Sequence, residues 1–313
     1  MPGQAVRHRP HHVRAACTTG ERMTAIIIQL LIGGILLGGL YALIAFGLSL
    51  IYGVVRILNF AHGTLLAMAG IAASVMFAAW HLNPMLIGAI LFPLAFGFGW
   101  LMYRYLLEPL KRRNPVQMTV GTVLVTVGLL LILSDLAALL AGPTSKNIPL
   151  EVSVFMVKGI IISTTDLAIF TGVVALTVAL HLILTRTWFG RAVRAVTQDG
   201  VGARLCGVRA GTIHAATVGF GCAIVALAGV LYVLNFPVNP YDGFALTVKA
   251  FTIIILGGIG NLLGALLAGI FLGVAEALTG FFWTSQWAPG LSIILLLAIL
   301  VVFPQGLLRR SGT

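Results

Sequence analysis

The sequence predicts an all-α, polytopic helical membrane protein with about eight to nine membrane segments, including broken or re-entrant helices. The first observation is composition: 59% of the 313 residues are hydrophobic and only 9% are charged, against about 25% charged residues in a typical soluble domain. The second is that apolar runs long enough to cross a bilayer recur from residue 25 almost to the end. The third is that the short alternating segments of an outer-membrane barrel are absent. A soluble enzyme, a nucleic-acid-binding protein and a disordered protein are excluded.

The first 22 residues are polar and basic, and they show no helical periodicity. Met23 then opens the first apolar run. We expect Met23 to be the functional start, with residues 1–22 a mis-assigned upstream extension; the alternative is a basic cytoplasmic tail. The run after Met23 is too long for the core of a signal peptide, so we expect no cleaved signal.

Nine apolar segments follow one another along the chain, and we expect them to form the membrane-embedded part. They are residues 25–55, 57–80, 84–107, 118–142, 166–185, 213–234, 244–257, 261–283 and 288–304.

The net charge of +11 comes largely from basic residues between these segments and at the chain ends. They gather in residues 104–113, in residues 186–209 and at Arg309 and Arg310, and the positive-inside rule places all three groups in the cytoplasm. Residues 143–165 then form a small external loop. The charge therefore indicates orientation in a membrane and not nucleic-acid binding.

Two segments depart from a simple membrane span. The first run exceeds the roughly 20 residues that one helix needs, so we expect a full helix plus a short or re-entrant one, with the break between residues 52 and 63. If the basic N-terminus is cytoplasmic, residues 25–107 cross an even number of times. The second departure is residues 244–257, which are short for a span and end in a glycine-rich turn. Irregular backbone at membrane depth lines a cavity or is buried in protein, and such broken helices point to a substrate pathway.

Lys249 and Glu276 are ionisable residues inside apolar segments, where a charge is costly. If residues 244–257 run inward and residues 261–283 run back out, both side chains lie about 7–10 Å below the external face at 1.5 Å per residue. They are then placed to pair. One interpretation is a buried ion pair that fixes two helices, and the other is a pair beside an outer gate.

The motifs of enzyme chemistry are absent. The sequence has no GxxxxGK[S/T] phosphate-binding loop, no HExxH and no GxSxG. Its three cysteines, Cys17, Cys206 and Cys222, have unrelated spacings and predict neither a disulfide framework nor a metal site. We therefore expect no enzyme, no metal and no cofactor.

Residues 190–211 read GRAVRAVTQDGVGARLCGVRAG. Small residues alternate with charges over two turns, which predicts a short amphipathic helix pair that ends at Gly207. Basic amphipathic segments most often lie on a membrane surface. The alternative is a compact face that binds a protein partner.

Three motifs make the chain resemble the branched-chain amino acid ABC transporter permeases of the LivH type. Their cytoplasmic loop commonly reads GRA-x-RA-x-x-x-D…A-x-L-x-G-[IV], as residues 190–208 do. Residues 38–63 end in the NFAHG signature of the family, and residues 239–278 carry NP-x-x-G…KAF…LGGIG…G…GxxEAL in the family order. The resemblance covers residues 23–310 as one permease domain, with a cytoplasmic coupling loop at about residues 186–211.

The resemblance implies an inner-membrane transport subunit without a cofactor or an ATP-binding motif of its own. Its partners would be a second homologous permease subunit, two cytoplasmic ABC ATPase subunits that use ATP, an external substrate-binding protein and membrane lipid. The residues that couple to an ATPase would be Arg191, Arg194, Ala195, Asp199, Ala203 and Gly207. The residues that shape the substrate path would be Asn59, His62, Gly63, Gly257, Gly258 and Gly260. Capping by Asn59 and His62, and a tight turn at the GGIG run, are the alternatives.

The implied substrates are leucine, isoleucine and valine, moved by alternating access. Related permeases of this type move urea or short amides, and the sequence leaves that alternative open. An ion-coupled secondary transporter is a remoter alternative, because it needs a carboxylate or cation site at mid-depth, for which Glu276 is the candidate.

Overall fold

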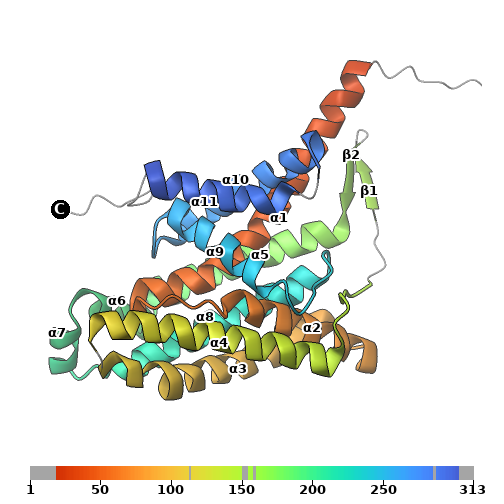
Figure 1. The fold of residues 1–313 in the computed structure, drawn as a ribbon. Coiled ribbons are helices and arrows are strands. Elements are labelled where there is room, and N and C mark those ends of the chain that lie inside the picture. Colours follow the sequence, from red (N-terminus) through yellow and green to blue (C-terminus); the bar gives the residue numbers. More distant parts are fainter. Residues whose placement is uncertain (1–18, 113, 150–153, 158–159, 285–286, 303–313) are drawn as a thin grey trace, which may run out of the picture.

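A computed structural model describes residues 19–112, 114–149, 154–157, 160–284 and 287–302 (Figure 1). Most of the basic segment 1–22 and the C-terminal Arg309 and Arg310 lie outside these residues. Within the described part, helices dominate. They are α1 (Thr19–Val55), α2 (His62–Trp80), α3 (Pro84–Leu101), α4 (Pro115–Ala141), α5 (Thr164–Arg186), α6 (Trp188–Gln198), α7 (Gly200–Leu205), α8 (Ala210–Val233), α9 (Gly243–Gly257), α10 (Leu262–Phe282) and α11 (Ala288–Val302).

Seven helices in the described residues are long and apolar enough to cross a membrane, namely α1 to α5, α8 and α10. Helix α9 and residues 290–299 of α11 are apolar but shorter. The polytopic helical membrane fold is therefore confirmed. A π-helix, Met102–Leu107, and a 3-10 turn, Pro109–Arg112, extend α3.

The molecule has two ends. Helices α6 and α7 lie at one of them, called here the α6 end, and the strands β1 (Val154–Val157) and β2 (Ile160–Ser163) lie at the other, called the β end (Figure 1). The strands pair antiparallel, with Val154 opposite Ser163. The sequence predicts a small external loop for residues 143–165, and the strands lie within it. The hairpin forms there because VFMV and IIIS are rich in residues that favour strands.

The expectation of a second, short or re-entrant helix within the first apolar run is wrong. The run is one uninterrupted helix, α1, and the break follows it as the non-helical residues 56–61. Helix α1 also begins at the β end and reaches the α6 end, where Val54 packs against α6. Residues 25–107 therefore pass from one end of the molecule to the other, which is an odd number of crossings.

The non-helical residues 56–61 explain this difference. They run back along α1, and α2 begins where the His62 ring meets Ile44, with Nε2 3.0 Å from the Ile44 carbonyl oxygen. Ile44 is eleven residues before the end of α1, or about 16 Å at 1.5 Å per residue. Non-helical chain thus covers part of the distance between the two ends, and α2 covers the rest.

Glycines bring α1 and α10 into backbone contact. A Cβ atom on Gly38 would lie 2.6 Å from the Gly269 carbonyl oxygen, and one on Gly34 would lie 2.7 Å from the Val274 Cα. Small residues at four-residue spacing permit this close approach in membranes. The two helices form one side of the core, and α8 packs on both α1 and α2.

Candidate functional site

Helix α6 is fixed to the body of the protein by its apolar face. Ala192, Val193 and Val196 are buried with Ile213 of α8, and Val54 of α1 packs against the same cluster. Arg191 and Arg194 lie on the opposite, exposed face. Movement of α6 would therefore be transmitted directly to α1 and α8.

Helix α7 has a defined start and a defined end. Asp199 caps its start, where the carboxylate accepts a hydrogen bond from the Val201 backbone N–H at 2.9 Å. Hydrogen bonds from the backbone of Gly202 and Val201 lower the pKa of the Asp199 carboxyl. Gly207, with a φ of +83°, reverses the chain in the left-handed conformation that favours glycine.

The hydrogen bonds around Gly207 are those of a Schellman turn. Gly207 N–H donates to the Arg204 carbonyl at 3.0 Å, and Val208 N–H donates to the Ala203 carbonyl at 2.9 Å. Asp199 and Gly207 are exposed and together fix the shape of the loop.

The second candidate region is the break before α2. Asn59 is buried, and its Oδ1 accepts a hydrogen bond from the Ala61 backbone N–H at 3.1 Å. Gly63 N–H donates to Thr247 Oγ1 of α9 at 2.8 Å. A Cβ atom on Gly63 would overlap the Gly243 carbonyl oxygen and lie 2.6 Å from Thr247 N. The starts of α2 and α9 therefore meet, and only glycine fits between them.

Three buried polar atoms at this break have no hydrogen-bond partner within the described structure. They are Asn59 Nδ2, His62 Nδ1 and Thr64 Oγ1. Because the Ile44 carbonyl can only accept, His62 Nε2 carries the proton there and Nδ1 is left as an acceptor. Asn59 thus caps the break, as one alternative held, while part of its amide stays unpaired. Buried unpaired groups of this kind call for an explanation beyond packing.

The glycine-rich turn after α9 lies nearer the α6 end. Gly258 and Gly260 have φ values of +83° and +77°, and Gly260 N–H donates to Ser49 Oγ of α1 at 3.2 Å. Gly257 packs against the backbone of Gly264 in α10. The turn is tight and closely packed, as the second alternative held. Helix α9 joins it to the break before α2, so both regions lie along the wall that α1 forms.

Lys249 and Glu276 form a buried ion pair, with Nζ 2.9 Å from Oε2. Tyr41 OH donates to the same Glu276 oxygen at 2.7 Å, and Ser292 Oγ donates to the other oxygen at 2.6 Å. Lys249 also donates to Tyr41 OH at 2.7 Å. The network joins α1, α9, α10 and α11 and satisfies a carboxylate that is only 4% exposed.

Residues 30–303 match the family described as the branched-chain amino acid transport system permease component. The match spans α6 and α7, the break before α2, the turn after α9 and the ion pair.

The chain belongs to this family.

Relatives of this permease carry the same description. The chain is 32% identical to the high-affinity branched-chain amino acid transport system permease protein LivH of Salmonella typhimurium, over 90% of this chain and 96% of the relative. It is 31% identical to LivH of Escherichia coli K12 over the same shares. It is 32% identical to BraD of Pseudomonas aeruginosa, also over 90% and 96%. The family drawn from the three motifs is confirmed.

The expected coupling residues of the permease differ in how exposed they are. Arg191, Arg194, Asp199 and Gly207 are exposed, Ala195 is half-buried, and Ala203 is buried in the cluster that holds α6 and α7. Ala203 therefore packs inward, toward Ile213 of α8.

Sequence reasoning missed several residues of the permease. Trp188 of α6 and Val201 of α7 are exposed, as is Leu205, which belongs to the predicted helix pair and is 85% exposed. A large apolar residue in a polar loop is a signal that would have found them. No pattern in the sequence points to Tyr41 or Ser292, because a single hydroxyl group in an apolar run does not indicate which residue it binds.

Among the residues that the structure describes, no three His, Cys, Asp or Glu side chains are placed to hold a metal ion.

Proposed function

We propose that this chain is the membrane permease of an ATP-driven importer of branched-chain amino acids, with its α6 end in the cytoplasm. The observation that carries the proposal is the exposed α6–α7 pair, fixed to α1 and α8, in a chain that matches named branched-chain amino acid permeases over nine-tenths of its length. The positive charges around residues 104–112 and 186–209 support the orientation.

In this proposal, ATPase subunits in the cytoplasm bind the exposed face of α6 and α7. Their closure on ATP moves α6, and the buried contacts of Val54 and Ile213 pass the movement to α1 and α8. Helix α1 in turn holds the turn after α9 through Ser49 and Gly260. A second permease subunit completes the translocation path, and an external binding protein delivers the substrate.

The path residues of the proposal are those at the two irregular segments. Asn59, His62 and Gly63 lie where the non-helical residues 56–61 meet α2. Gly257, Gly258 and Gly260 lie at the end of α9. Irregular backbone at membrane depth is tolerated where it is buried or lines a water-filled cavity. The unpaired atoms of Asn59 and His62 supply a donor and an acceptor that fit the carboxylate and the ammonium of an amino acid when the path opens.

An ion-coupled secondary transporter fits less well. Its coupling carboxylate would be Glu276, and Lys249, Tyr41 and Ser292 already satisfy that side chain. The urea and amide alternative has no support in the names of the three relatives above, which all specify branched-chain amino acids.

Uptake of labelled leucine by cells with and without this gene tests the proposal. We expect uptake to fall on deletion, to return with the intact gene, and to be competed by isoleucine and valine but not by urea. Unchanged leucine uptake, in a strain that lacks other leucine transporters, contradicts the proposed substrate class. Purification of the tagged chain without any ATPase subunit contradicts the proposed machinery.

A further inference from the structure

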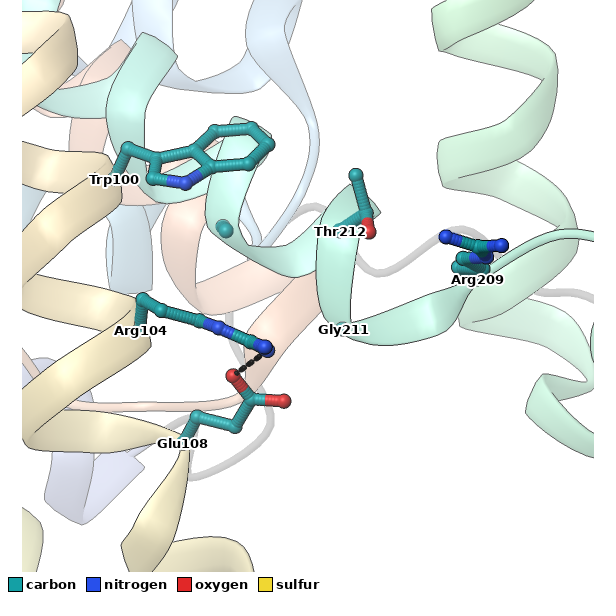
Figure 2. Close-up of a pocket in the computed structure, with 7 residues that line it drawn as sticks. Trp100, Arg104, Glu108, Arg209, Gly211 and Thr212 are labelled. Carbon is teal, nitrogen blue, oxygen red and sulfur yellow. Dashed lines mark hydrogen bonds and ion pairs between the residues drawn. The ribbon is translucent and has the colours of Figure 1, made fainter.

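A polar cavity of about 410 Å³ opens at the α6 end, where the π-helix after α3 meets the start of α8 (Figure 2). The proposed transport cycle makes no use of it. The residues that line it are Trp100, Arg104, Glu108, Arg209, Gly211, Thr212 and Ala215.

The π-helix contributes to the shape of this cavity. Residues Met102–Leu107 adopt the wider helix, and Glu108 N–H donates to the Tyr103 carbonyl at 2.8 Å. Short π segments inside helices frequently occur at functional sites. On the facing helix, a Cβ atom on Gly211 would lie 3.0 Å from Glu108 Oε1. The glycine leaves room for the carboxylate beside α8.

The wall of the cavity carries a net positive charge. Arg104 Nη1 lies 2.6 Å from Glu108 Oε2, so this carboxylate is neutralised within the wall. Arg209 is exposed and has no ion-pair partner among the residues described. Lys111 adds a further charge nearby, with Nζ 3.0 Å from His214 Nδ1. Two arginines therefore line the cavity with one carboxylate: Arg104 of the π-helix points to Glu108, and Arg209, the residue before α8, lies apart from this pair (Figure 2).

An apolar strip lies on α3, the helix that the π-helix with Arg104 extends. The strip consists of Ile90, Leu94 and Leu101, which are 42%, 62% and 53% exposed. Trp100 lies where the strip ends, at the polar end of the span, a position that tryptophan favours at membrane interfaces. Along α3 and the π-helix that extends it, the surface thus changes from apolar, which suits lipid acyl chains, to basic, which suits a lipid headgroup.

We propose that this cavity binds the phosphate headgroup of an anionic phospholipid, with its acyl chains along the strip on α3. Arginine suits phosphate because its planar guanidinium donates two parallel hydrogen bonds. Basic pockets between membrane helices at the cytoplasmic face bind such headgroups. A free phosphate ion would use the arginines but gain nothing from the apolar strip, so the strip favours the lipid.

Lipid retention by the purified full-length chain tests the proposal. Nanodiscs of phosphatidylcholine with a minority of phosphatidylglycerol are prepared, and native mass spectrometry counts the lipids that stay bound. We expect the wild-type chain to retain phosphatidylglycerol in preference to phosphatidylcholine. The variant Arg104→Gln/Arg209→Gln should bind it at least about tenfold more weakly. Arg186→Gln, which removes an exposed arginine at the same end outside the cavity, is the matched control and should bind like wild type.

Several outcomes overturn the proposal. If the wild-type chain and the double variant retain phosphatidylglycerol equally, the cavity is not a lipid-binding site. Stabilisation by inorganic phosphate in lipid-free detergent, with none added by phosphatidylglycerol, makes it a free-anion site. Unchanged lipid binding with loss of a co-purified ATPase subunit makes it a protein contact. If removal of Arg104 leaves Glu108 unpaired and lowers the unfolding temperature, Arg209→Gln alone, which breaks no ion pair, must still weaken lipid retention.

Discussion

Lys249 Nζ lies 2.9 Å from Glu276 Oε2, and this ion pair joins α9 to α10 in the apolar body of the protein. Because Tyr41 and Ser292 complete the hydrogen bonds of the carboxylate, the pair is fully satisfied. A buried pair of this kind adds little net stability, but loss of one partner leaves an uncompensated buried charge.

Glu276→Gln should therefore destabilise the permease by about 3–5 kcal/mol, measured by thermal unfolding and by the amount assembled in membranes. The double variant Lys249→Met/Glu276→Met removes both charges and should recover much of the loss. Asp135→Asn removes an exposed carboxylate from α4 and should have little effect. A double variant no more stable than Glu276→Gln would show that the pair does not act as a unit.

Gly207→Trp should uncouple ATP hydrolysis from uptake. The φ of +83° at this position costs a side-chain-bearing residue about 1–2 kcal/mol, so the turn after α7 should shift. We expect at least about a tenfold loss of leucine uptake, which corresponds to 1.4 kcal/mol, with normal membrane insertion. Uptake and ATPase activity in proteoliposomes measure this. Gly200→Ala is the control, because a Cβ atom there would meet open space; normal uptake by Gly207→Trp would contradict the coupling role.

The hydrogen-bonded cap of α7 should be lost at low pH, because it depends on the charged form of the Asp199 carboxylate. Its pKa is lowered by the backbone hydrogen bonds that cap α7, so the charged form is favoured in the folded loop. The cap is fully present above the ordinary aspartate pKa and is lost as the pH falls through the lowered value. Hydrogen exchange of the Val201 amide should therefore speed up, relative to an unstructured amide, only in acid. Asp199→Asn should flatten this pH dependence and Asp199→Ala should remove the protection at every pH; an unchanged profile in Asp199→Asn would exclude the carboxylate as its source.

Gly63→Ala should disrupt the contact between α2 and α9. The added methyl group overlaps the Gly243 carbonyl and the Thr247 amide, and such overpacking costs about 1–3 kcal/mol. Unfolding temperature and leucine uptake should both fall. Gly128→Ala in α4 meets no atom within 4 Å and should be neutral or slightly stabilising. If Gly63→Ala and Gly128→Ala had the same unfolding temperature and the same leucine uptake, the start of α2 would be free to move.

Leu205→Ala should weaken ATPase binding without loss of stability. Leu205 is 85% exposed, so its truncation leaves no cavity in the permease. Apolar anchors of an interface cost more than 1 kcal/mol on truncation, and we expect about tenfold weaker association in co-purification titrations. Thr185→Ala, on α5, is the control for a small change outside the α6–α7 pair. Unaltered association would move the interface away from α7.

Much of the fold could be predicted from the sequence, because membrane segments are set by local hydrophobicity and length. All nine predicted segments overlap a helix of the described residues, and the irregular residues after α1 and α9 were both located. The predicted helix pair ending at Gly207 is also present, because the amphipathic pattern of α6 and the left-handed glycine are local signals. Composition and the recurring apolar runs together predicted the class of protein.

Only the tertiary structure decided how these segments meet. Residues 56–61 return along α1 to Ile44, and Tyr41 reaches Glu276 across 235 residues of chain. Ala203 faces inward for the same reason, because Ile213 and Val193 pack around it. Periodicity tells which residues share a face of a helix but not which helix covers that face. Contacts between distant segments depend on close packing and on the pairing of buried polar groups, and neither is encoded at any single position of the chain.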